Sequence, residues 1–501
     1  MLRKFRIIVA TVVFALLTLL FLDFTGTLHL WFGWLAKIQL IPAILAGSVV
    51  ILVILALLTI FFGRIYCSVI CPLGVMQDGI SNVSGRRKGK KNRFSYSKAL
   101  SGLRYGVLAL FIVGMIFGTL SIIVSFLDPY AGFGRIAANL LAPIYRLGNN
   151  VLAHIAESMN SYAFHTTSVW IKSGITFGVA VATLLIVGVL AWRHGRTYCN
   201  TICPVGTFLG FISRFSMFKP VLGEGCDECG LCEKRCKASC IDSKNKVIDY
   251  SRCVTCFNCI ESCKVGAVKY AFSCCCKKET AQPEIACESG KDGISRRSFM
   301  TIAGTVVAAQ ALEAQQGITD GGLAEIENKR RPVRNTPIVP PGSQSLRNMQ
   351  RKCTACQLCV SACPNNVLRP SNRLATLMQP EMSFERGWCR VECVECSLVC
   401  PTSAIQRITP AEKTGISIGY AVWIRDNCIV HRDDVQCRAC ERNCPTGAIT
   451  LVTCDGHPER NHRVPVVDKN MCNGCGACEF FCPARPFSAI YVEGHAEHQS
   501  I

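Results

Sequence analysis

The stretch CDECGLCEKRC, Cys226–Cys236, carries four cysteines in the spacing C-x2-C-x2-C-x3-C. This spacing holds [4Fe–4S] clusters, because a tight loop presents three thiolates to three corners of one cubane. In proteins with two such clusters, the fourth cysteine reaches the second cluster. The stretch therefore predicts a small ferredoxin-like domain of the α+β class.

The same spacing recurs at Cys253–Cys263, Cys353–Cys363 and Cys472–Cys482. Two looser copies, Cys389–Cys400 and Cys428–Cys444, keep the C-x2-C-x3-C ending. Six sets of four soft thiolates, with no histidine in matching positions, favour iron–sulfur clusters over structural zinc. Disulfide frameworks belong mainly to small secreted domains, which this long chain is not. We therefore expect six [4Fe–4S] clusters, which use 24 of the 34 cysteines.

Cross-ligation between motifs predicts the ligand set of each cluster. The first motif pair gives one cluster on Cys226, Cys229, Cys232 and Cys263, and another on Cys253, Cys256, Cys259 and Cys236. In the C-terminal part we pair the outer motifs, Cys353, Cys356 and Cys359 with Cys482, and Cys472, Cys475 and Cys478 with Cys363. The inner motifs then pair Cys389, Cys393 and Cys396 with Cys444, and Cys428, Cys437 and Cys440 with Cys400. Pairing of adjacent motifs is the alternative.

A second motif occurs twice, 132 residues apart: GRIYCSVICPLG at Gly63–Gly74 and GRTYCNTICPVG at Gly195–Gly206. Cysteines four apart share one side of a helix, so each copy presents a pair. We expect Cys67, Cys71, Cys199 and Cys203 to converge on a further metal or iron–sulfur site at the membrane edge. Simple packing is the first alternative. A redox disulfide is the second, and it is disfavoured on the reducing cytoplasmic side.

Six cysteines match no motif, and we expect them not to be ligands: Cys240, Cys274, Cys275, Cys276, Cys287 and Cys454.

Four apolar segments are long enough to cross a bilayer, which takes about 20 helical residues. They are Ile7–Asp23, Ile38–Phe62, Leu103–Leu127 and Ile171–Trp192. The basic N-terminus, Arg86–Arg93 and Arg193–Arg196 fall on one side, which is therefore the cytoplasmic side. This topology accounts for much of the net charge of +20 and argues against nucleic-acid binding. The outer loop contains an amphipathic stretch, Ile136–Ile155, which we expect on the membrane surface.

Ser295–Met300, SRRSFM, is similar to a twin-arginine export signal, and a short apolar run follows it. The sequence thus predicts five parts. Residues 1–219 form a four-helix membrane domain with two C-x3-C-P motifs, and 220–287 a two-cluster ferredoxin domain. Residues 288–320 form the signal or anchor segment, 321–351 a linker, and 352–501 a four-cluster ferredoxin domain outside the cytoplasm.

Residues 1–278, with four spans, two C-x3-C-P motifs and two ferredoxin motifs, resemble the NapH-type membrane polyferredoxins. Residues 295–501 resemble the NapG-type exported four-cluster ferredoxins, so the chain is similar to a fusion of both. The resemblance implies a quinol dehydrogenase component of the bacterial inner membrane. Its substrate would be quinol from the membrane pool, and its partner a periplasmic cytochrome or reductase.

No nucleophile–base pair, P-loop or nucleotide-binding fingerprint is present, so electron transfer is the simplest function. An assembly factor that supplies electrons to a metalloenzyme is the alternative. A redox-sensing regulator is a third and weaker option, because the sequence contains no evident signalling or DNA-binding module. His154, His165, Glu157 and Asp128 are candidates for contact with quinol or its protons. About 30 Å of hydrocarbon would separate the two ferredoxin domains, and no sequence motif bridges that distance.

Overall fold

The computed structural model describes residues 1–87, 94–117, 121–223, 225–272, 319–320, 324–325, 327–453 and 463–501. Contacts divide the chain into two units, described separately. The first comprises Met1–Ala142, Ile171–Ala271 and Asn328–Ile501, and the second Pro143–Trp170 and Phe272–Glu327. The twin-arginine stretch and Cys274, Cys275, Cys276, Cys287 and Cys454 lie outside the described residues.

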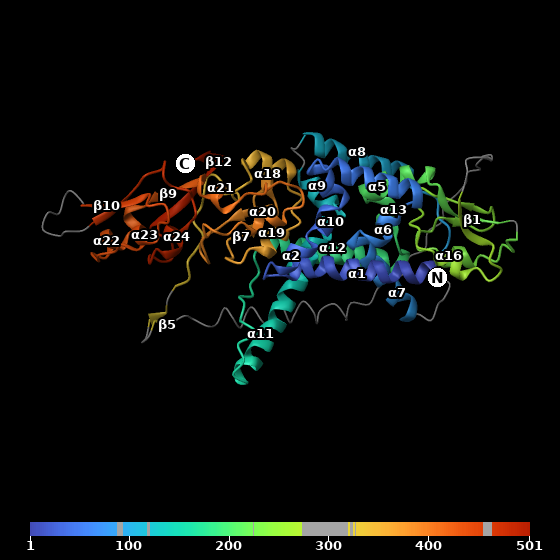
Figure 1. Cartoon of the computed structure of the whole chain (residues 1–501), viewed down its shortest axis with the longest axis horizontal. Helices are drawn as coiled ribbons and strands as arrows, with labels where there is room; N and C mark the ends of the chain where they lie inside the picture. Colours follow the sequence, from blue (N-terminus) through green and yellow to red (C-terminus); the bar gives the residue numbers. More distant parts are fainter. Residues whose placement is uncertain are drawn as a thin grey trace. The chain divides into compact units, whose positions relative to one another are not determined.

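Two helices of the first unit, α1 (Leu2–Leu22) and α12 (Gly174–His194), are long and apolar enough to cross a membrane (Figure 1). The second predicted span is divided into α4 (Leu40–Leu45) and α5 (Val49–Phe62). The division falls at Gly47, whose φ of +68° favours glycine. The third predicted span contains α8 (Ser101–Phe117) and α9 (Ser121–Leu127). Two of the four expected spans are thus continuous helices, and α5 and α8 are shorter than a full span.

Short helices connect these segments and fill the space between them. They are α2 (Thr27–Phe32), α3 (Trp34–Lys37), α6 (Ile65–Val69), α7 (Pro72–Arg87), α10 (Pro129–Ile136), the π-helix η1 (Ala137–Leu141), α13 (Thr197–Thr201), α14 (Pro204–Ile212) and η2 (Ser213–Phe215). α10 begins where the Asp128 carboxylate accepts a hydrogen bond from the Tyr130 amide at 3.0 Å, with proline in the first turn. Phe21 of α1 packs on Tyr130, with ring centroids 5.7 Å apart, and so fixes α10 against α1.

The first ferredoxin-type region has the expected α+β character. β1 (Phe218–Leu222) pairs with β4 (Val268–Phe272), and β2 (Ile241–Asp242) pairs with β3 (Val247–Ile248). α15 (Leu231–Lys234) and α16 (Asn258–Ser262) carry the third cysteine of each motif. Gly230 and Phe257, which precede these helices, have φ of +69° and +61°. In each motif a residue in the left-handed conformation thus connects the tight cysteine loop to the helix that follows.

The C-terminal region repeats this plan. Its helices are α18 (Leu346–Lys352), α19 (Leu358–Ala362), η3 (Leu374–Thr376), α20 (Glu395–Val399), α21 (Pro410–Thr414), η4 (Arg425–Asn427), α22 (Ile429–Arg432), α23 (Ala439–Arg442) and α24 (Ala477–Phe481). Its antiparallel strand pairs are β7 (Leu368–Pro370) with β8 (Pro380–Met382), β9 (Ile416–Trp423) with β12 (Ile490–Ser500), and β10 (Ile449–Thr453) with β11 (Arg463–Val467).

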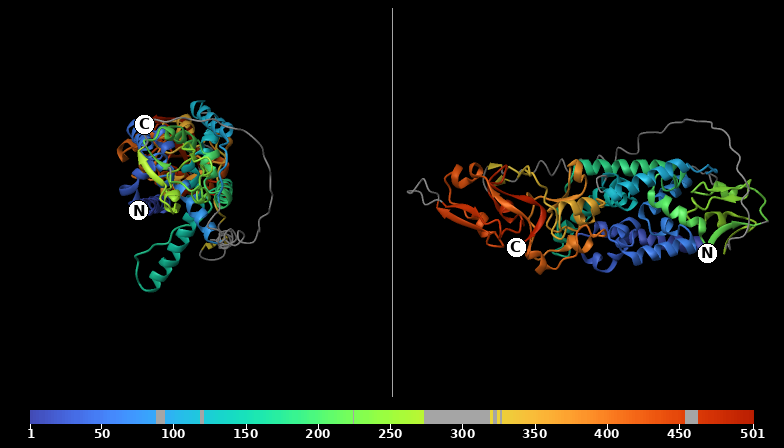
Figure 2. Two further views of the ribbon diagram at one scale, coloured as in Figure 1. Left: turned by 90° about the vertical axis from the view of Figure 1, so that its right-hand side faces the viewer. Right: turned by 90° about the horizontal axis from the view of Figure 1, so that it is seen from above.

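The ends of α1 contact different ferredoxin-type regions (Figures 1 and 2). At its start, Arg3 forms an ion pair with Glu261 of α16. Beyond its other end, Gly26 lies against the Glu395 carboxylate at the start of α20. A helix of 21 residues is about 31 Å long. The two regions are therefore separated by about the thickness of a bilayer's hydrocarbon core.

A buried ion pair ties the last cysteine helix to the C-terminal sheet. Arg334 donates to both Glu479 carboxylate oxygens, at 2.6 and 2.7 Å, and to the Val492 carbonyl at 2.7 Å. Both side chains are almost fully buried. Glu479 follows Cys478 in α24, so the pair positions a cysteine loop.

We expect Arg334→Ala to destabilise the C-terminal region by about 3–5 kcal/mol, because it leaves a buried carboxylate without its partner. The exposed pair Arg438–Glu441 is the control, and Arg438→Ala should leave the stability almost unchanged, because solvent screens exposed ion pairs. The urea midpoint for loss of iron–sulfur absorbance in the detergent-solubilised full chain measures both. Equal midpoints for the two variants would contradict the assignment.

The second unit contains most of α11 (Ala142–Ser158) and the strand pair β5 (Thr319–Asp320) and β6 (Ala324–Glu325). α11 covers only the later part of the predicted amphipathic stretch Ile136–Ile155, whose first residues form the end of α10 and η1. Asn150 holds the segment after α11 by bonding both the amide and the carbonyl of Thr167 at 2.8 Å. Placement of α11 on a membrane surface stays a prediction.

Candidate iron–sulfur sites

The C-terminal cysteines converge in adjacent motifs, so the nested pairing predicted above is wrong. Electrostatic interactions join Cys400 to Cys353 and Cys359, and Cys363 to Cys389 and Cys396. Others join Cys482 to Cys440, and Cys444 to Cys472 and Cys475. The sets are Cys353/Cys356/Cys359/Cys400, Cys389/Cys393/Cys396/Cys363, Cys428/Cys437/Cys440/Cys482 and Cys472/Cys475/Cys478/Cys444. Pairing of adjacent motifs is favoured because the shorter loop between them loses less conformational entropy when it closes.

Two of these sets surround pockets with the chemistry that a [4Fe–4S] cluster needs. Cys363, Cys389, Cys393 and Cys396 line a pocket of about 340 Å³ with apolar walls. Cys428, Cys437, Cys440 and Cys482 line another of about 380 Å³. Four soft thiolate donors in an apolar pocket fit the cluster.

Burial raises the pKa of Cys440 and of Cys475 to about 12. These thiols are therefore protonated at neutral pH when no metal is bound. Cluster binding must displace their protons.

In the first ferredoxin-type region the predicted ligands Cys236, Cys253, Cys256 and Cys259 line one pocket of about 390 Å³. Cys226 and Cys229 interact electrostatically with Cys232. Cys263 follows α16, and its place with these three stays a prediction. Cys240, which we expected not to be a ligand, lines the same pocket with its Sγ 3.5 Å from Cys236 Sγ, and whether it binds a cluster stays a prediction.

The two C-x3-C-P pairs lie together, with all four thiols buried. Cys71 interacts with Cys67 and Cys199, and Cys203 interacts with the other three. Both copies fold alike: the Cys71 and Cys203 amides each donate to the tyrosine carbonyl five residues earlier at 3.0 Å. The structure thus brings the predicted four-thiolate group together.

In each copy the arginine donates a hydrogen bond to the other copy, and the last glycine lies next to the arginine of the other copy. Arg64 donates to the Cys199 carbonyl at 3.3 Å, and Arg196 donates to the Cys67 carbonyl at 2.6 Å. A Cβ on Gly74 would lie 2.8 Å from the Arg196 guanidinium, and a Cβ on Gly206 would lie 2.8 Å from Arg64. Glycine is needed at both places because a Cβ would clash with the Cys67 carbonyl oxygen at Gly74 and with the Cys199 carbonyl oxygen at Gly206, in addition to meeting the arginine. We infer that the two copies form one pseudo-symmetric site, in which sequence reasoning missed the roles of both arginines.

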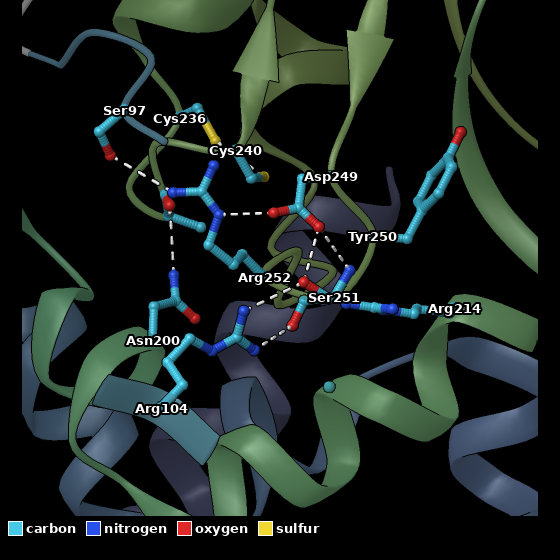
Figure 3. Close-up of polar contacts among 12 residues, drawn as sticks. Ser97, Arg104, Asn200, Arg214, Cys236, Cys240, Asp249, Tyr250, Ser251 and Arg252 are labelled. Atoms are coloured by element: carbon cyan, nitrogen blue, oxygen red, sulfur yellow. Dashed lines mark hydrogen bonds and ion pairs between the residues drawn. The ribbon is translucent and has the colours of Figure 1, made fainter. Parts of the chain in front are cut away.

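The same arginines hold the cysteine loops of the first ferredoxin-type region. Arg64 donates to the Ser251 carbonyl at 3.1 Å and to the Asn200 side chain at 3.0 Å. Ser251 also accepts two hydrogen bonds from Arg104, as Figure 3 shows. The Arg196 amide donates to the Lys237 carbonyl at 2.9 Å, next to Cys236. The C-x3-C-P site is therefore in direct contact with the loops that carry Cys236 and Cys253.

Asp78 neutralises part of this positive charge. Its carboxylate contacts Arg196 at 2.9 Å, Arg6 at 3.1 Å and the Lys237 ammonium at 3.5 Å. Burial alone would raise the pKa of Asp78, but these three cations hold it well below its usual range. Asp78 therefore stays charged and keeps the three basic residues in place.

In the part of the chain that the structure describes, no three or more Cys, His, Asp or Glu side chains are close enough together to hold a single metal ion. A tetrahedral zinc site would need sulfur atoms roughly 4 Å apart, since each lies about 2.3 Å from the metal. A cubane instead binds each thiolate at a separate corner. The C-x3-C-P group has four buried thiol groups that interact electrostatically and that, like those of the six cluster sets, are soft donors of the kind that iron–sulfur clusters take.

The other end of the bundle contacts the loop of Cys353–Cys363. Gly134 of α10 lies against the Cys356 carbonyl, and a Cβ there would also meet the Phe21 ring at 2.8 Å. The Asn139 amide donates to the Gln357 side chain at 2.8 Å, and Ser173 donates to the Asn372 side chain at 2.7 Å. Helical segments from two parts of the chain thus hold the first C-terminal cysteine loop.

Buried polar groups without hydrogen-bond partners gather at this contact. Within the described residues, no partner binds the three guanidinium nitrogens of Arg135, the Tyr130 hydroxyl or one Asp128 oxygen. Tyr130 interacts electrostatically with Cys356 and Cys400 on one side and with Tyr66, beside Cys67, on the other. Such groups point to a missing polar neighbour. Of the predicted quinol candidates, only Asp128 lies here; His154, Glu157 and His165 belong to the second unit.

Comparison with known proteins identifies the same cysteine groups. The family of 4Fe-4S binding domains matches residues 45–91 and 175–221, which contain the two C-x3-C-P pairs. Two families of 4Fe-4S dicluster domains match residues 352–405 and 435–485. The first dicluster match contains the adjacent motifs Cys353–Cys363 and Cys389–Cys400, and the second contains Cys437, Cys440 and Cys444 of one motif with Cys472–Cys482 of the next, in agreement with the pairing in the structure.

The first curated relative, an uncharacterized protein of Methanocaldococcus jannaschii, is 38% identical over 109 residues, which is 21% of this chain and 43% of that protein. The putative electron transport protein YccM of Escherichia coli is 23% identical over 45% of this chain and 56% of its own length. The chain thus spans about half the length of these relatives. No solved structure matches.

The ferredoxin-type protein NapF of Escherichia coli is 31% identical over 141 residues, 28% of this chain and 76% of NapF. The methylamine utilization ferredoxin-type protein MauM of Methylobacillus flagellatus is 30% identical over 28% of this chain and 62% of its own length. With its several 4Fe-4S domains, the chain belongs to the ferredoxin-type electron transport proteins.

Proposed function

We propose that this protein spans the bacterial inner membrane as a quinol dehydrogenase component similar to a fused NapH and NapG. It would carry electrons from quinol to a periplasmic cytochrome or reductase. The observation that carries the proposal is the position of the buried C-x3-C-P site. It contacts the cysteine loops of one ferredoxin-type region, and its bundle contacts those of the other about 31 Å away along α1.

The exposed apolar surface supports the membrane location. Only 28% of the 18-residue apolar segment of α1 and 22% of that of α12 is buried. α5 exposes further apolar side chains, including Val50, Val53 and Ile54. Apolar helices that turn most of their surface outward need a lipid environment.

[4Fe–4S] clusters supply one-electron transfer when bound. The chain fixes where the cluster-binding cysteines lie. Arg64 and Arg196 form hydrogen bonds with the loops that carry Cys253 and Cys236, and the same arginines donate to the carbonyls of Cys199 and Cys67. Tyr66 and Tyr130 then lead to Cys356. This order supports a continuous electron path through the bundle, and such a path would connect the two ferredoxin-type regions.

Asp128 is the proposed proton acceptor for quinol oxidation. It follows the third predicted span, and burial raises its pKa to about 6 despite the nearby Arg135. Above pH 6 the carboxylate is charged and can accept a proton; below pH 6 it is already protonated. The rate of cluster reduction by quinol should therefore fall as the pH drops below about 6. Asp128→Asn should lower the rate at pH 7 and abolish this inflection, and an unchanged pH profile would exclude Asp128.

Inverted membrane vesicles given a reduced quinol analogue under anaerobic conditions test the function. The expected result is the appearance of reduced-cluster signals in the EPR spectrum. If the clusters are intact and dithionite reduces them, but the quinol analogue does not, the quinol dehydrogenase proposal fails.

A further inference from the structure

Five cysteines surround the pocket where four ligands are needed. Besides Cys253, Cys256 and Cys259, the pocket of about 390 Å³ is lined by both Cys236 and Cys240. The two sulfur atoms lie 3.5 Å apart, and Figure 3 shows them side by side. Cys240 also contacts the Cys253 thiol and is only 1% exposed. It is therefore as near to the ligand positions as Cys236 is.

The two thiols come from segments that are anchored differently. The segment after Cys236 is held toward the bundle, since the Lys237 carbonyl accepts from the Arg196 amide and the Lys237 ammonium contacts Asp78. Cys240 is held to the ferredoxin-type sheet, where its carbonyl accepts from the Asp249 amide at 2.8 Å. Ser239, with φ of +50°, turns the chain between them. Both sulfurs thus lie in the lining of one pocket, although their segments are held by different parts of the chain.

A second observation points to a ligand in this pocket. The Thr255 side chain belongs to the same lining and is 4% exposed, yet its hydroxyl has no hydrogen-bond partner among the described residues. A buried hydroxyl in this position is suited to donate to a cluster sulfide or thiolate.

Two other fourth cysteines lie beside a hydroxyl instead of a second thiol outside their set. The Sγ of Cys400 lies 3.6 Å from the Thr402 hydroxyl, and the Sγ of Cys444 lies 3.6 Å from the Thr446 hydroxyl. Both are followed by proline, whereas Cys236 is followed by lysine. Among these three fourth cysteines, an additional thiol is found next to Cys236, and Cys400 and Cys444 provide matched controls.

We propose that Cys240 is a reserve ligand, which can replace Cys236 as the fourth thiolate of the cluster bound by Cys253, Cys256 and Cys259. The proposal rests on the proposed iron–sulfur role of these cysteines. In the exchange one Fe–S bond to Cys236 breaks and one to Cys240 forms. The Cys240 thiol gives up its proton and the Cys236 thiolate takes one up, so no oxidant or reductant is needed.

Serine variants of the full chain, purified anaerobically, test the proposal through iron content and EPR. Cys236→Ser and Cys240→Ser should each keep the iron content of the unchanged protein. Cys236→Ser should shift the EPR signal of one cluster, because its ligand environment has changed. The double variant should lose about four iron atoms per chain, which is one cluster.

The control Cys444→Ser, which has no spare thiol, should by itself lose or visibly degrade one cluster. If Cys236→Ser loses as much iron as the double variant, the reserve-ligand proposal is overturned. If Cys256→Ser and the double variant both keep all iron, the iron–sulfur assignment of the pocket fails instead. Equal far-UV circular dichroism of all variants excludes general unfolding.

Discussion

Replacing Cys71 and Cys203 together by serine should remove about four iron atoms per chain and reduce electron transfer between the two ferredoxin-type regions to background. The four thiols of the C-x3-C-P pairs are buried, and Cys203 interacts electrostatically with Cys199, Cys71 and Cys67. Two hydroxyls in place of two thiolates cannot complete a cubane site. The loss of a whole cluster is therefore expected.

The fold should survive this change. Cys203 caps α14 by accepting from the Gly206 amide at 3.4 Å, and serine is a good residue for that role. Cys454→Ser, at a cysteine outside every motif, is the control and should keep both iron and electron transfer. Iron analysis with EPR, followed by the rate at which the C-terminal clusters are reduced, measures both effects. Full iron content in the double variant would show that the pairs are packing residues.

The second large effect is expected from Gly134→Ala. A methyl group at this position has no room, because it would meet the Cys356 carbonyl and lie 2.8 Å from the Phe21 ring. The first C-terminal cysteine loop must then move away from α10. We expect unchanged iron content, since no ligand is altered, and at least a tenfold slower reduction of the C-terminal clusters.

Gly132→Ala is the matched control in the same helix. Its methyl group would make only ordinary contacts, 3.8 Å from Thr183 and 4.0 Å from Arg135. Stopped-flow absorbance after reduction at the N-terminal region compares the two variants. Equal rates in Gly132→Ala and Gly134→Ala would mean that electrons do not pass through this contact.

The cysteine spacing predicted the ferredoxin-type regions, and the repeat predicted that Cys67, Cys71, Cys199 and Cys203 converge. The first depends on local sequence, because a tight loop fixes the relative positions of its cysteines, whereas the second used the repeat itself, because two equivalent copies are expected to occupy equivalent positions at one membrane edge. Pairing between motifs is a tertiary property, and the nested pairing failed because loop closure favours neighbours. The break at Gly47 was visible as a glycine inside an apolar run, but its effect on the second span was not predicted.

Other features had weaker signals or none. Arg64 and Arg196 occupy equivalent positions in the repeat, which could have suggested a shared role. Only the folded structure shows that each arginine donates a hydrogen bond to a carbonyl of the other copy. Cys240 belongs to no sequence motif. Only the folded structure shows that its Sγ lies 3.5 Å from Cys236 Sγ. Arg135 and Tyr130 stand in a segment without any pattern, and only their burial without partners marks them.

The most direct test of the central proposal uses sealed, quinone-free vesicles that contain the purified chain and trapped ferricyanide. Dithionite is added outside, so that electrons can reach the interior only through the protein. The account predicts that the trapped ferricyanide loses its colour with the unchanged chain, but not in empty vesicles or with the Cys71→Ser, Cys203→Ser variant. If the clusters accessible from outside become reduced while the trapped ferricyanide keeps its colour, no electron path crosses the bundle and the account is contradicted.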